Sequence, residues 1–388
     1  MSQKICIIRR AYYPLESHVR RNAETLLSAG YSIDLICLRG RGQPAFEIID
    51  GVNVHRLPLK SRRGRIFWYP VDYLIFFLLA FIKVTRLQLR NHFAIVEVDS
   101  MPDFLVFASL IPRLQGARII LYLFESMPEL WAQKTGMPMT HWMIRLIKWQ
   151  ERISCLFADA VICCHELACD ALVRMGVPEG KITVILNVPD NRVYQQRLVG
   201  DNSQEEDGVF NIVQHGTITE NYGIQVVIHA LTLINPAIPV LYNVVGFGEH
   251  RPKLEEMVSE FNLQKRVTFH GYVTREHLLE ILYCSDIGVV PMLFEYQSPN
   301  KLFELITMGI PVIASDLKTF RQHFSDEEIL YFETGNSEDL AEAIKFAVQH
   351  PDQMAQQAQR ARHRFQNYSW EVMKERYIEL YKKFSHRQ

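Results

Sequence analysis

Short apolar runs alternate with segments of helical periodicity along nearly the whole chain, and this alternation most constrains the fold. In the first half, runs typical of buried strands lie at residues 5–9, 33–38, 95–98, 118–123, 160–163 and 183–186. In the second half, comparable runs lie at residues 210–214, 240–245, 266–269, 287–290 and 311–314. Most are followed by apolar residues at the 3.6-residue spacing of a helix. Repeated strand–helix units predict an α/β fold with parallel sheets covered by helices on both faces.

The chain length and one polar segment predict two domains. A chain of 388 residues is too long for a single hydrophobic core of typical size. Residues 200–208 are almost entirely polar or glycine, which is typical of a linker. We therefore expect a Rossmann-like N-terminal domain at 1–195, a linker at 196–208 and a Rossmann-like C-terminal domain at 209–368. The amphipathic segment at about 369–388 predicts a last helix.

The net charge of −1 hides two halves of opposite sign. Residues 1–200 contain 25 Lys and Arg against 17 Asp and Glu, whereas residues 201–388 contain 17 against 26. The basic half favours contact with an anionic partner, such as a membrane surface or a phosphorylated acceptor. An uneven surface charge without function is the alternative. We expect no nucleic-acid partner.

Cysteine usage and the first residues favour a cytoplasmic location. The seven cysteines lie mostly in apolar runs and have no Cys-x-x-Cys spacing, as in reduced proteins. The apolar run that starts near Lys4 is too short for a signal peptide.

Residues 298–314 predict half of a nucleotide-binding site. Ser298-Pro299-Asn300 is typical of a helix start, and Met308-Gly309 ends the helix before a buried strand. A helix N-terminus offers unpaired N–H groups and a partial positive charge to a phosphate. Lys301 adds a full positive charge there. Glu304, one turn further on, can accept two hydrogen bonds from neighbouring hydroxyls, as on a ribose.

Glycines follow three successive strands of the second half, as Gly216, Gly246 with Gly248, and Gly271. Ligands of open parallel sheets bind beyond the carboxyl ends of the strands, where glycine lets backbone N–H groups approach a phosphate or a base. Neither half has Gly-x-Gly-x-x-Gly after its first strand, and the P-loop motif is also missing. These absences argue against a dinucleotide fingerprint and a P-loop.

In order and spacing, these motifs resemble the family 4 glycosyltransferases over nearly the whole chain. The similar segments are His215-Gly216-Thr217, Val245 to Glu249, Phe269 to Val273, Asp286 to Pro291 and Ser298 to Ala314. The resemblance implies the GT-B fold, in which two Rossmann-like domains face a central cleft and the C-terminal helix packs back on the first domain. It also implies transfer of a sugar, with retention, from a nucleoside-diphosphate-sugar to a glycan or lipid-linked acceptor. Bacterial envelope or exopolysaccharide synthesis is the setting that it implies.

The resemblance also assigns roles in the second domain. Glu304 would hold the ribose, Lys301 the diphosphate, and the backbone near Tyr272 and Val273 the base. The donor-binding residues predicted in this way are Gly216, Thr217, Gly246, Gly248, Tyr272, Val273, Ser298, Asn300, Lys301 and Glu304. Because Asp-x-Asp and metal-like histidine clusters are absent from the sequence, we expect no tightly bound metal and no other cofactor.

The first domain is expected to hold the acceptor. Carboxylates and arginines follow its strands, at the ends where ligands of such sheets bind. The residues that we predict to contact the acceptor are Glu16, Arg20, Asp103 and Glu129. Lys301, Glu304 and Glu125 are the predicted catalytic residues.

Four positions depart from the family pattern. Tyr296 stands where many members have a glutamate, although Glu295 precedes it. Thr217 and Tyr222 stand where an arginine and a lysine often bind phosphate, and Phe124 replaces a histidine. These departures leave open a degenerate, non-catalytic GT-B partner protein. A nucleotide-sugar epimerase on the same fold is a further alternative.

One apolar run favours a peripheral membrane protein. Residues 73–82 are ten consecutive apolar residues, preceded by a basic cluster at 60–65 and by Phe67-Trp68-Tyr69. Ten residues make only about half of a membrane-spanning helix. The run therefore predicts either an element that lies on a membrane surface or a helix buried against the sheet. We expect a cytoplasmic enzyme, with the inner face of the plasma membrane as the alternative location.

Overall fold

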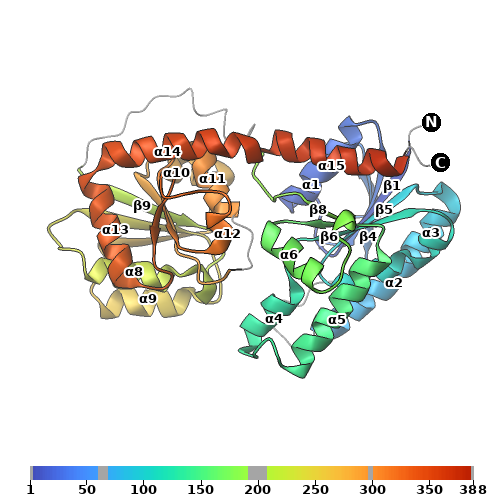
Figure 1. The fold of residues 1–388 in the computed structure, drawn as a ribbon, viewed down its shortest axis with the longest axis horizontal. Coiled ribbons are helices and arrows are strands. Elements are labelled where there is room, and N and C mark those ends of the chain that lie inside the picture. The colour runs from blue at the N-terminus through green and yellow to red at the C-terminus, as the bar shows by residue number, and fades with distance from the viewer. Residues whose placement is uncertain (1–2, 60–68, 191–207, 296–299, 386–388) are drawn as a thin grey trace. The chain divides into compact units, whose positions relative to one another are not determined.

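The computed structural model describes residues 3–59, 69–190, 208–295 and 300–385, and it divides into two compact units (Figure 1). Unit 1 comprises Met1–Asn187 and Glu371–Gln388, and unit 2 comprises Val188–Trp370. The predicted domain boundary at 195 and nearly all of the predicted linker lie outside the described residues.

Unit 1 contains an eight-stranded sheet in the order β3-β4-β2-β1-β5-β6-β7-β8. All neighbouring strands are parallel except β3 and β4, which form an antiparallel pair. The strands are β1 (Lys4–Arg9), β2 (Ser32–Leu38), β3 (Phe46–Ile49), β4 (Val52–Leu57), β5 (Ile95–Asp99), β6 (Arg118–Leu123), β7 (Ala160–Cys163) and β8 (Ile182–Val184).

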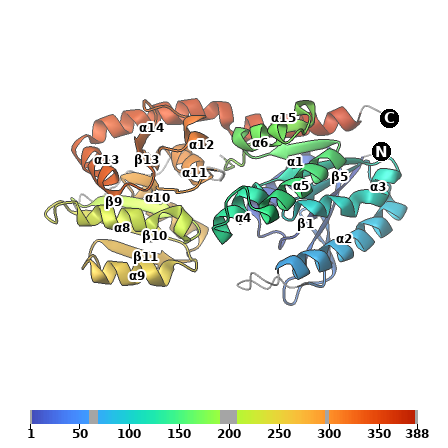
Figure 2. The same ribbon diagram turned by 60° about the horizontal axis from the view of Figure 1, so that its bottom comes forward.

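Helices cover both faces of this sheet (Figure 2). They are α1 (Ser17–Ser28), α2 (Tyr69–Asn91), α3 (Leu110–Leu114), α4 (Met127–Thr135), α5 (Trp142–Phe157), α6 (Glu166–Arg174) and α15 (Trp370–Ser385), with 3₁₀ turns η2 (Asp103–Ser109) and η3 (Glu179–Lys181). Alternate residues of β5 face opposite sides of the sheet. Val96 and Val98 pack in one core with Phe76 of α2, whereas Glu97 contacts α15.

Unit 2 contains a six-stranded parallel sheet in the order β11-β10-β9-β12-β13-β14. The strands are β9 (Phe210–His215), β10 (Val240–Val245), β11 (Val267–Gly271), β12 (Ile287–Val290), β13 (Val312–Ser315) and β14 (Leu330–Phe332). The helices are α8 (Ile224–Thr232), α9 (Arg251–Glu260), α10 (Arg275–Tyr283), α11 (Asn300–Met308), α12 (Lys318–Arg321), α13 (Ser337–Gln349) and α14 (Pro351–Phe365), with turns η4 (Glu220–Tyr222) and η5 (Gln366–Tyr368).

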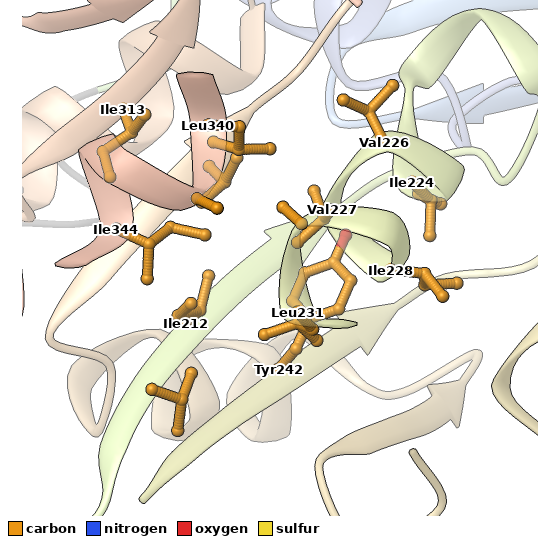
Figure 3. Packing of buried hydrophobic residues seen from close by; sticks show 14 of the residues in the cluster. Ile212, Ile224, Val226, Val227, Ile228, Leu231, Tyr242, Ile313, Leu340 and Ile344 are labelled. Carbon is orange, nitrogen blue, oxygen red and sulfur yellow. The ribbon is translucent and has the colours of Figure 1, made fainter. Parts of the chain in front are cut away.

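The core of unit 2 lies between this sheet and helices α8 and α13. Figure 3 shows Val227 and Leu231 of α8 near Tyr242 of the sheet, with Ile344 of α13 near Ile212. All five side chains are buried. The apolar spacing that predicted helices therefore corresponds to the helix faces that pack on the strands.

The predicted strands are all present, with ends that differ by at most two residues, and three strands were missed. Two of them, β3 and β4, form a hairpin that turns at Asp50-Gly51, where both residues have positive φ angles of 49° and 85°. An Asp-Gly pair between two apolar runs is the usual signal of such a hairpin. The third strand, β14, has only three residues.

The last helix is anchored in unit 1 by a buried carboxylate. The Tyr377 hydroxyl lies 2.9 Å from each oxygen of Glu97 and donates its one proton to this carboxylate, and Tyr381 donates to Oε2 at 2.5 Å. Met373 of the same helix accepts a hydrogen bond from the backbone N–H of Leu186 at 3.3 Å. The three α15 side chains are fully buried. This helix therefore completes the core of unit 1 from the far end of the chain.

Burial raises the pKa of Glu97 to about 7, although hydrogen bonds from the two tyrosines and from Asp99 oppose the rise. Because the unfolded chain has the ordinary pKa of 4.5, the folded protein binds more protons between pH 4.5 and 7. This contribution to stability is complete below pH 4.5 and is lost as the pH rises through 7. Glu97→Gln should reduce the loss by up to about 3 kcal/mol, at 1.36 kcal/mol per pKa unit.

Urea unfolding at pH 5 and pH 8 measures this difference. Glu375→Gln, on the exposed side of α15, is the matched control and should leave the pH dependence of the wild type unchanged. An equal pH dependence in wild type and Glu97→Gln would contradict the prediction.

Candidate functional site

The candidate site of unit 2 lies where its strand order reverses. β9 has β10 on one side and β12 on the other, so the connections that follow β9 and β11 leave the sheet in opposite directions. Ligands of open α/β sheets bind beyond the carboxyl ends of the strands at such a point. His215 and Gly216 end β9 there, and α11 begins after β12 with Asn300 and Lys301.

Backbone hydrogen bonds of the predicted glycines connect the ends of three strands. Gly216 donates its N–H to Val245 at 2.9 Å, and Gly246 donates its N–H to Gly271 at 2.9 Å. A Cβ atom on Gly246 would stand 1.8 Å from the carbonyl oxygen of Gly216, and the φ of Gly246 is +141°. A Cβ on Gly248 would stand 2.0 Å from the carbonyl oxygen of Ile218. Only glycine fits this backbone-to-backbone packing.

Lys301 and Glu304 are brought together as the sequence predicts, and His215 joins them. The Lys301 ammonium lies 3.0 and 3.1 Å from the two carboxylate oxygens of Glu304. His215 Nε2 lies 2.7 Å from Glu304 Oε2. The Lys301 side chain also passes Gly216, since a Cβ there would stand 3.3 Å from Lys301 Cε. The end of β9 and the first turns of α11 therefore form one polar cluster.

The cluster keeps Glu304 ionised. Burial raises the pKa of Glu304, but the Lys301 charge and the hydrogen bond to His215 outweigh it and lower that pKa to about 2. Burial lowers the pKa of His215, against the effect of Glu304. At neutral pH the site therefore offers a carboxylate that accepts hydrogen bonds and an ammonium that neutralises an anion.

Two exposed aromatic rings stand at the same edge of the sheet. Tyr272, a predicted base neighbour, is 83% exposed, and its ring packs edge-on against Phe247 at 6.1 Å. Phe247 is 56% exposed and was not among the predicted site residues, because the sequence singles out only the glycines on either side of it. Exposed rings are suitable for stacking on a planar base.

The remaining predicted donor residues lie around this cluster. Thr217 is exposed in the loop after β9, and Val273 is half-buried after β11. Asn300 is the first residue of α11. Ser298 and Tyr296 lie outside the described residues. Glu295, the acid next to Tyr296, accepts a hydrogen bond from the backbone N–H of Thr319 at 2.9 Å, so its carboxylate holds the start of α12.

A second cation near this edge was missed by the sequence analysis. Arg251 begins α9, and its guanidinium lies 3.2 Å from where a Cβ on Gly271 would stand. It also lies over the ring of Phe269 at 5.6 Å and pairs with Glu255 at 2.8 Å. Arg251 thus places positive charge at the end of β11, whereas Thr217 and Tyr222 supply none after β9.

Unit 1 has a second candidate site at its own reversal point, between β1 and β5. Arg9 and Asp99 are register partners at the carboxyl ends of these strands. The Arg9 guanidinium donates to Glu16 at 3.0 Å and lies 4.7 Å from the Phe124 ring centre. His18 lies 3.1 Å from the Glu16 carboxylate and 4.3 Å, ring to ring, from Phe124.

His18 thus lies beside Phe124, the residue that departs from the family histidine. His18 was not predicted as a site residue, because nothing in the order of the chain relates residue 18 to residue 124. Burial lowers the pKa of His18, while Glu16 opposes this effect. Burial raises the pKa of Glu16, but His18 and Arg9 outweigh it and lower that pKa to about 2. The cluster joins an ionised carboxylate, a guanidinium and an imidazole.

Two of the other predicted acceptor residues, Asp103 and Glu129, are buried. Asp103 is fully buried, neither oxygen has a hydrogen-bond partner among the described residues, and burial raises its pKa to about 7. Glu129 is buried and accepts a hydrogen bond from Ser126. Both lie near buried Glu151, whose pKa is raised by burial and by their charges. Contact of either with an acceptor stays a prediction that requires a rearrangement of this region.

Two other residues of unit 1 have clear positions. Arg20 is on the surface and pairs with Glu24 at 2.7 Å and with Asp50 at 3.3 Å. Glu125 is half-buried and lines a small cavity with Ser126 and His165. The described residues contain no group of three or more side chains that could hold a metal ion.

Family models match both halves of the chain. The family described as Glycosyltransferase Family 4 matches residues 15–190, and the one described as Glycosyl transferases group 1 matches residues 210–350. An uncharacterized glycosyltransferase of Methanocaldococcus jannaschii is 22% identical over 342 residues, which cover 81% of this chain and 80% of that protein. A D-inositol 3-phosphate glycosyltransferase of Rhodococcus erythropolis is 29% identical over 160 residues, 38% of this chain and 35% of that protein.

Solved structures share the fold over the full length. Sucrose-phosphate synthase from Thermosynechococcus elongatus has a TM-score of 0.80 at 19% identity and covers 100% of both chains. Anabaena HepE in complex with UDP has a TM-score of 0.72 at 15% identity, with 98% of this chain and 100% of that chain covered. These neighbours are GT-B glycosyltransferases.

Proposed function

Because this chain is a GT-B glycosyltransferase with a Glycosyltransferase Family 4 domain and a group 1 domain, we propose that it uses a nucleoside-diphosphate-sugar as donor. The acceptor of the sugar is a glycan or a lipid-linked saccharide. The reaction breaks the bond between the anomeric carbon and the diphosphate and forms a bond to an acceptor oxygen, which loses its proton. Retention at the anomeric carbon, transfer of a hexose and a role in the cell envelope are parts of the same proposal.

The observation that carries the proposal is the Lys301–Glu304–His215 cluster at the reversal point of the unit 2 sheet. The ionised Glu304 carboxylate suits the two hydroxyls of a ribose. Lys301 and the N–H groups at the start of α11 suit the diphosphate, and they stabilise the charge that develops as it leaves. HepE has been solved with UDP and with UDP-glucose, which supports a nucleotide-sugar donor on this fold.

Unit 1 would hold the acceptor at its own reversal point. Arg9 and His18 offer positive charge and an imidazole, so a phosphate-bearing acceptor suits this end of the sheet. The enzyme would work in the cytoplasm, at the inner face of the plasma membrane when the acceptor is anchored in lipid. No resident metal or other cofactor is part of this proposal.

Calorimetric titration with UDP, GDP, TDP and ADP tests the donor site. One diphosphate should bind with a millimolar or smaller dissociation constant, and Lys301→Ala should weaken that binding about tenfold or more, since a hydrogen bond to a charged group is worth roughly 1.5–3 kcal/mol. Lys345→Ala is the matched control, because Lys345 forms a comparable ion pair with Glu342, 2.9 Å away on α13.

Two results would contradict the proposal and favour another function. A folded protein that binds none of the four nucleotides would be a non-catalytic partner protein, as the departures at Thr217 and Tyr222 allow. Conversion of a nucleotide-sugar without any acceptor would instead identify an epimerase.

A further inference from the structure

Helix α5 carries large apolar side chains on its solvent side. Trp142, Leu146, Trp149 and Leu156 are 69%, 53%, 58% and 36% exposed. Their spacing of four, three and seven residues places them on one face of the helix. The opposite face is buried in unit 1 through Ile144, Glu151 and Cys155. A helix at the surface of a soluble domain normally carries polar residues at these outward positions.

Helices α2 and α3 show the same pattern. Among the described side chains, every exposed residue from Pro70 to Ile82 of α2 is apolar, and so are the two exposed residues at the ends of α3. They are Pro70, Val71, Leu74, Ile75, Leu78 and Ile82 of α2 and Leu110 and Leu114 of α3. More than half of the large apolar side chains that are exposed among the described residues lie on α2, α3 and α5.

These three helices lie next to one another on the same side of the unit 1 sheet (Figures 1 and 2). The turn η2, which continues into α3, joins them. Phe77 of α2 packs on Phe104 of η2 with ring centres 5.9 Å apart, and Phe107 of η2 packs on Phe157 of α5 at 5.1 Å. We call the outward side of α2, α3 and α5 the basic apolar face.

The charge of this face has one sign. Its basic residues are Lys83, Arg86, Arg90, Arg113, Arg145, Lys148 and Arg152, of which Arg113 is paired with Asp159 at 3.6 Å. The acidic residues within the three helices are Asp72 and Glu151, and both are buried. Within the described helices, the face therefore combines apolar and basic side chains with no exposed carboxylate.

We propose that the basic apolar face docks on a lipid bilayer with anionic headgroups. Tryptophan and leucine enter the boundary between headgroups and acyl chains, while arginine and lysine remain at the level of the phosphates. This inference deepens the proposed function, on which it rests for its purpose, since it would hold the enzyme beside lipid-linked acceptors. Among the described residues, no helix has the length and hydropathy that a membrane span needs.

The charge favours a bilayer over a second copy of the chain. Two copies that met through this face would bring like charges together without an exposed carboxylate to pair with them, which is unfavourable at a protein interface. An anionic bilayer instead supplies the opposite charge over the whole face. The basic cluster at 60–65 lies outside the described residues.

Sedimentation of the full chain with vesicles tests the proposal. The protein should bind vesicles of phosphatidylcholine with 30% phosphatidylglycerol, chosen here as the probe, and bind pure phosphatidylcholine about tenfold or more weakly. Trp149→Glu and Arg152→Glu should each reduce binding to the anionic vesicles about tenfold, and added salt should reduce binding by the wild type. Leu233→Glu and Lys253→Glu, exposed residues of unit 2, are the matched controls and should bind like the wild type.

Three outcomes would overturn the inference. They are no binding to either vesicle, equal loss of binding in the control variants, and a dimer in sedimentation velocity that Trp149→Glu dissociates. The last result would identify a second copy as the occupant. Nucleotide titration of the same proteins distinguishes failure of this inference from failure of the proposed function. Vesicle binding without nucleotide binding would reject only the proposed function. Nucleotide binding without vesicle binding would reject only the docking of the basic apolar face.

Discussion

Glu304→Ala should weaken the binding of the donor nucleotide about ten- to a hundredfold. The carboxylate is ionised, because Lys301 and His215 hold its pKa at about 2 against the effect of burial. Loss of a hydrogen bond to a charged group costs roughly 1.5–3 kcal/mol. The substitution also removes the group that holds the Lys301 ammonium 3.0 Å away, so the diphosphate contact loses its positioning. Calorimetric titration with the diphosphate that the wild type prefers measures the loss.

A nucleotide without ribose hydroxyls shows whether Glu304 acts on the ribose. The wild type should bind the 2′,3′-dideoxy form of the same diphosphate about as weakly as Glu304→Ala binds the normal form. The variant should barely distinguish the two forms, because the contact is already lost. Glu342→Ala removes the carboxylate of the ion pair on α13 and serves as the matched control. If Glu304→Ala still preferred the normal nucleotide as strongly as the wild type does, the ribose assignment would be wrong.

Gly246→Ala should lower the free energy of unfolding by about 3–5 kcal/mol, in the range of the most severe single substitutions. The new methyl group would stand 1.8 Å from the carbonyl oxygen of Gly216, and the φ of +141° is strained for any residue with a Cβ. Relief requires the loop after β9 to move, which breaks the hydrogen bond from Gly216 to Val245. Urea unfolding followed by circular dichroism measures the change.

Substitutions at two other glycines distinguish close packing from backbone strain as the cause of this loss. Gly136 has a φ of +67° and open space around it, so Gly136→Ala should cost only the strain, about 1 kcal/mol. Gly180 has open space and no positive φ, so Gly180→Ala should be close to neutral. If Gly246→Ala cost no more than Gly136→Ala, close packing of the strand ends could not be its cause.

Most of the fold was predictable because most strands of the two sheets have a clear apolar pattern in the sequence. A strand buried on both faces is a continuous apolar run, and this is how β6, β7, β10 and β12 were predicted with their exact ends. β3 was missed because its residues are largely exposed and their pattern is weak. The Asp50-Gly51 turn was the available signal for the hairpin of β3 and β4.

The side-chain contacts of the candidate site were predictable only within one helix. Lys301 and Glu304 are three residues apart on α11, so helical geometry alone places them together. The contact of Glu304 with His215 joins residues 89 positions apart, and the contact between the His18 and Phe124 rings likewise depends on the sheet order. Burial was equally hard to predict: the sequence placed Asp103 at a strand end, but Asp103 begins η2 and is fully buried.

The exposed sides of the unit 1 helices were equally hard to predict from the sequence. The apolar run at 73–82 predicted either a surface helix or a buried one, and α2 is both, with Phe76 buried and Leu78 half exposed. The exposed tryptophans of α5 follow ordinary helical spacing, which sequence reasoning assigns to a core. Only the fold shows which side of each helix is covered.

The anchoring of α15 on Glu97 has a consequence for the order in which the protein is built. Unit 1 needs Glu371–Gln388, which are synthesised only after every residue of unit 2. Until they arrive, the carboxylate of Glu97 lacks its two tyrosine donors and one side of the first sheet lacks its covering helix. In the nascent chain, unit 2 can therefore complete its core before unit 1 does. A chain that stops before Glu371 would leave the earlier-made unit permanently unfinished.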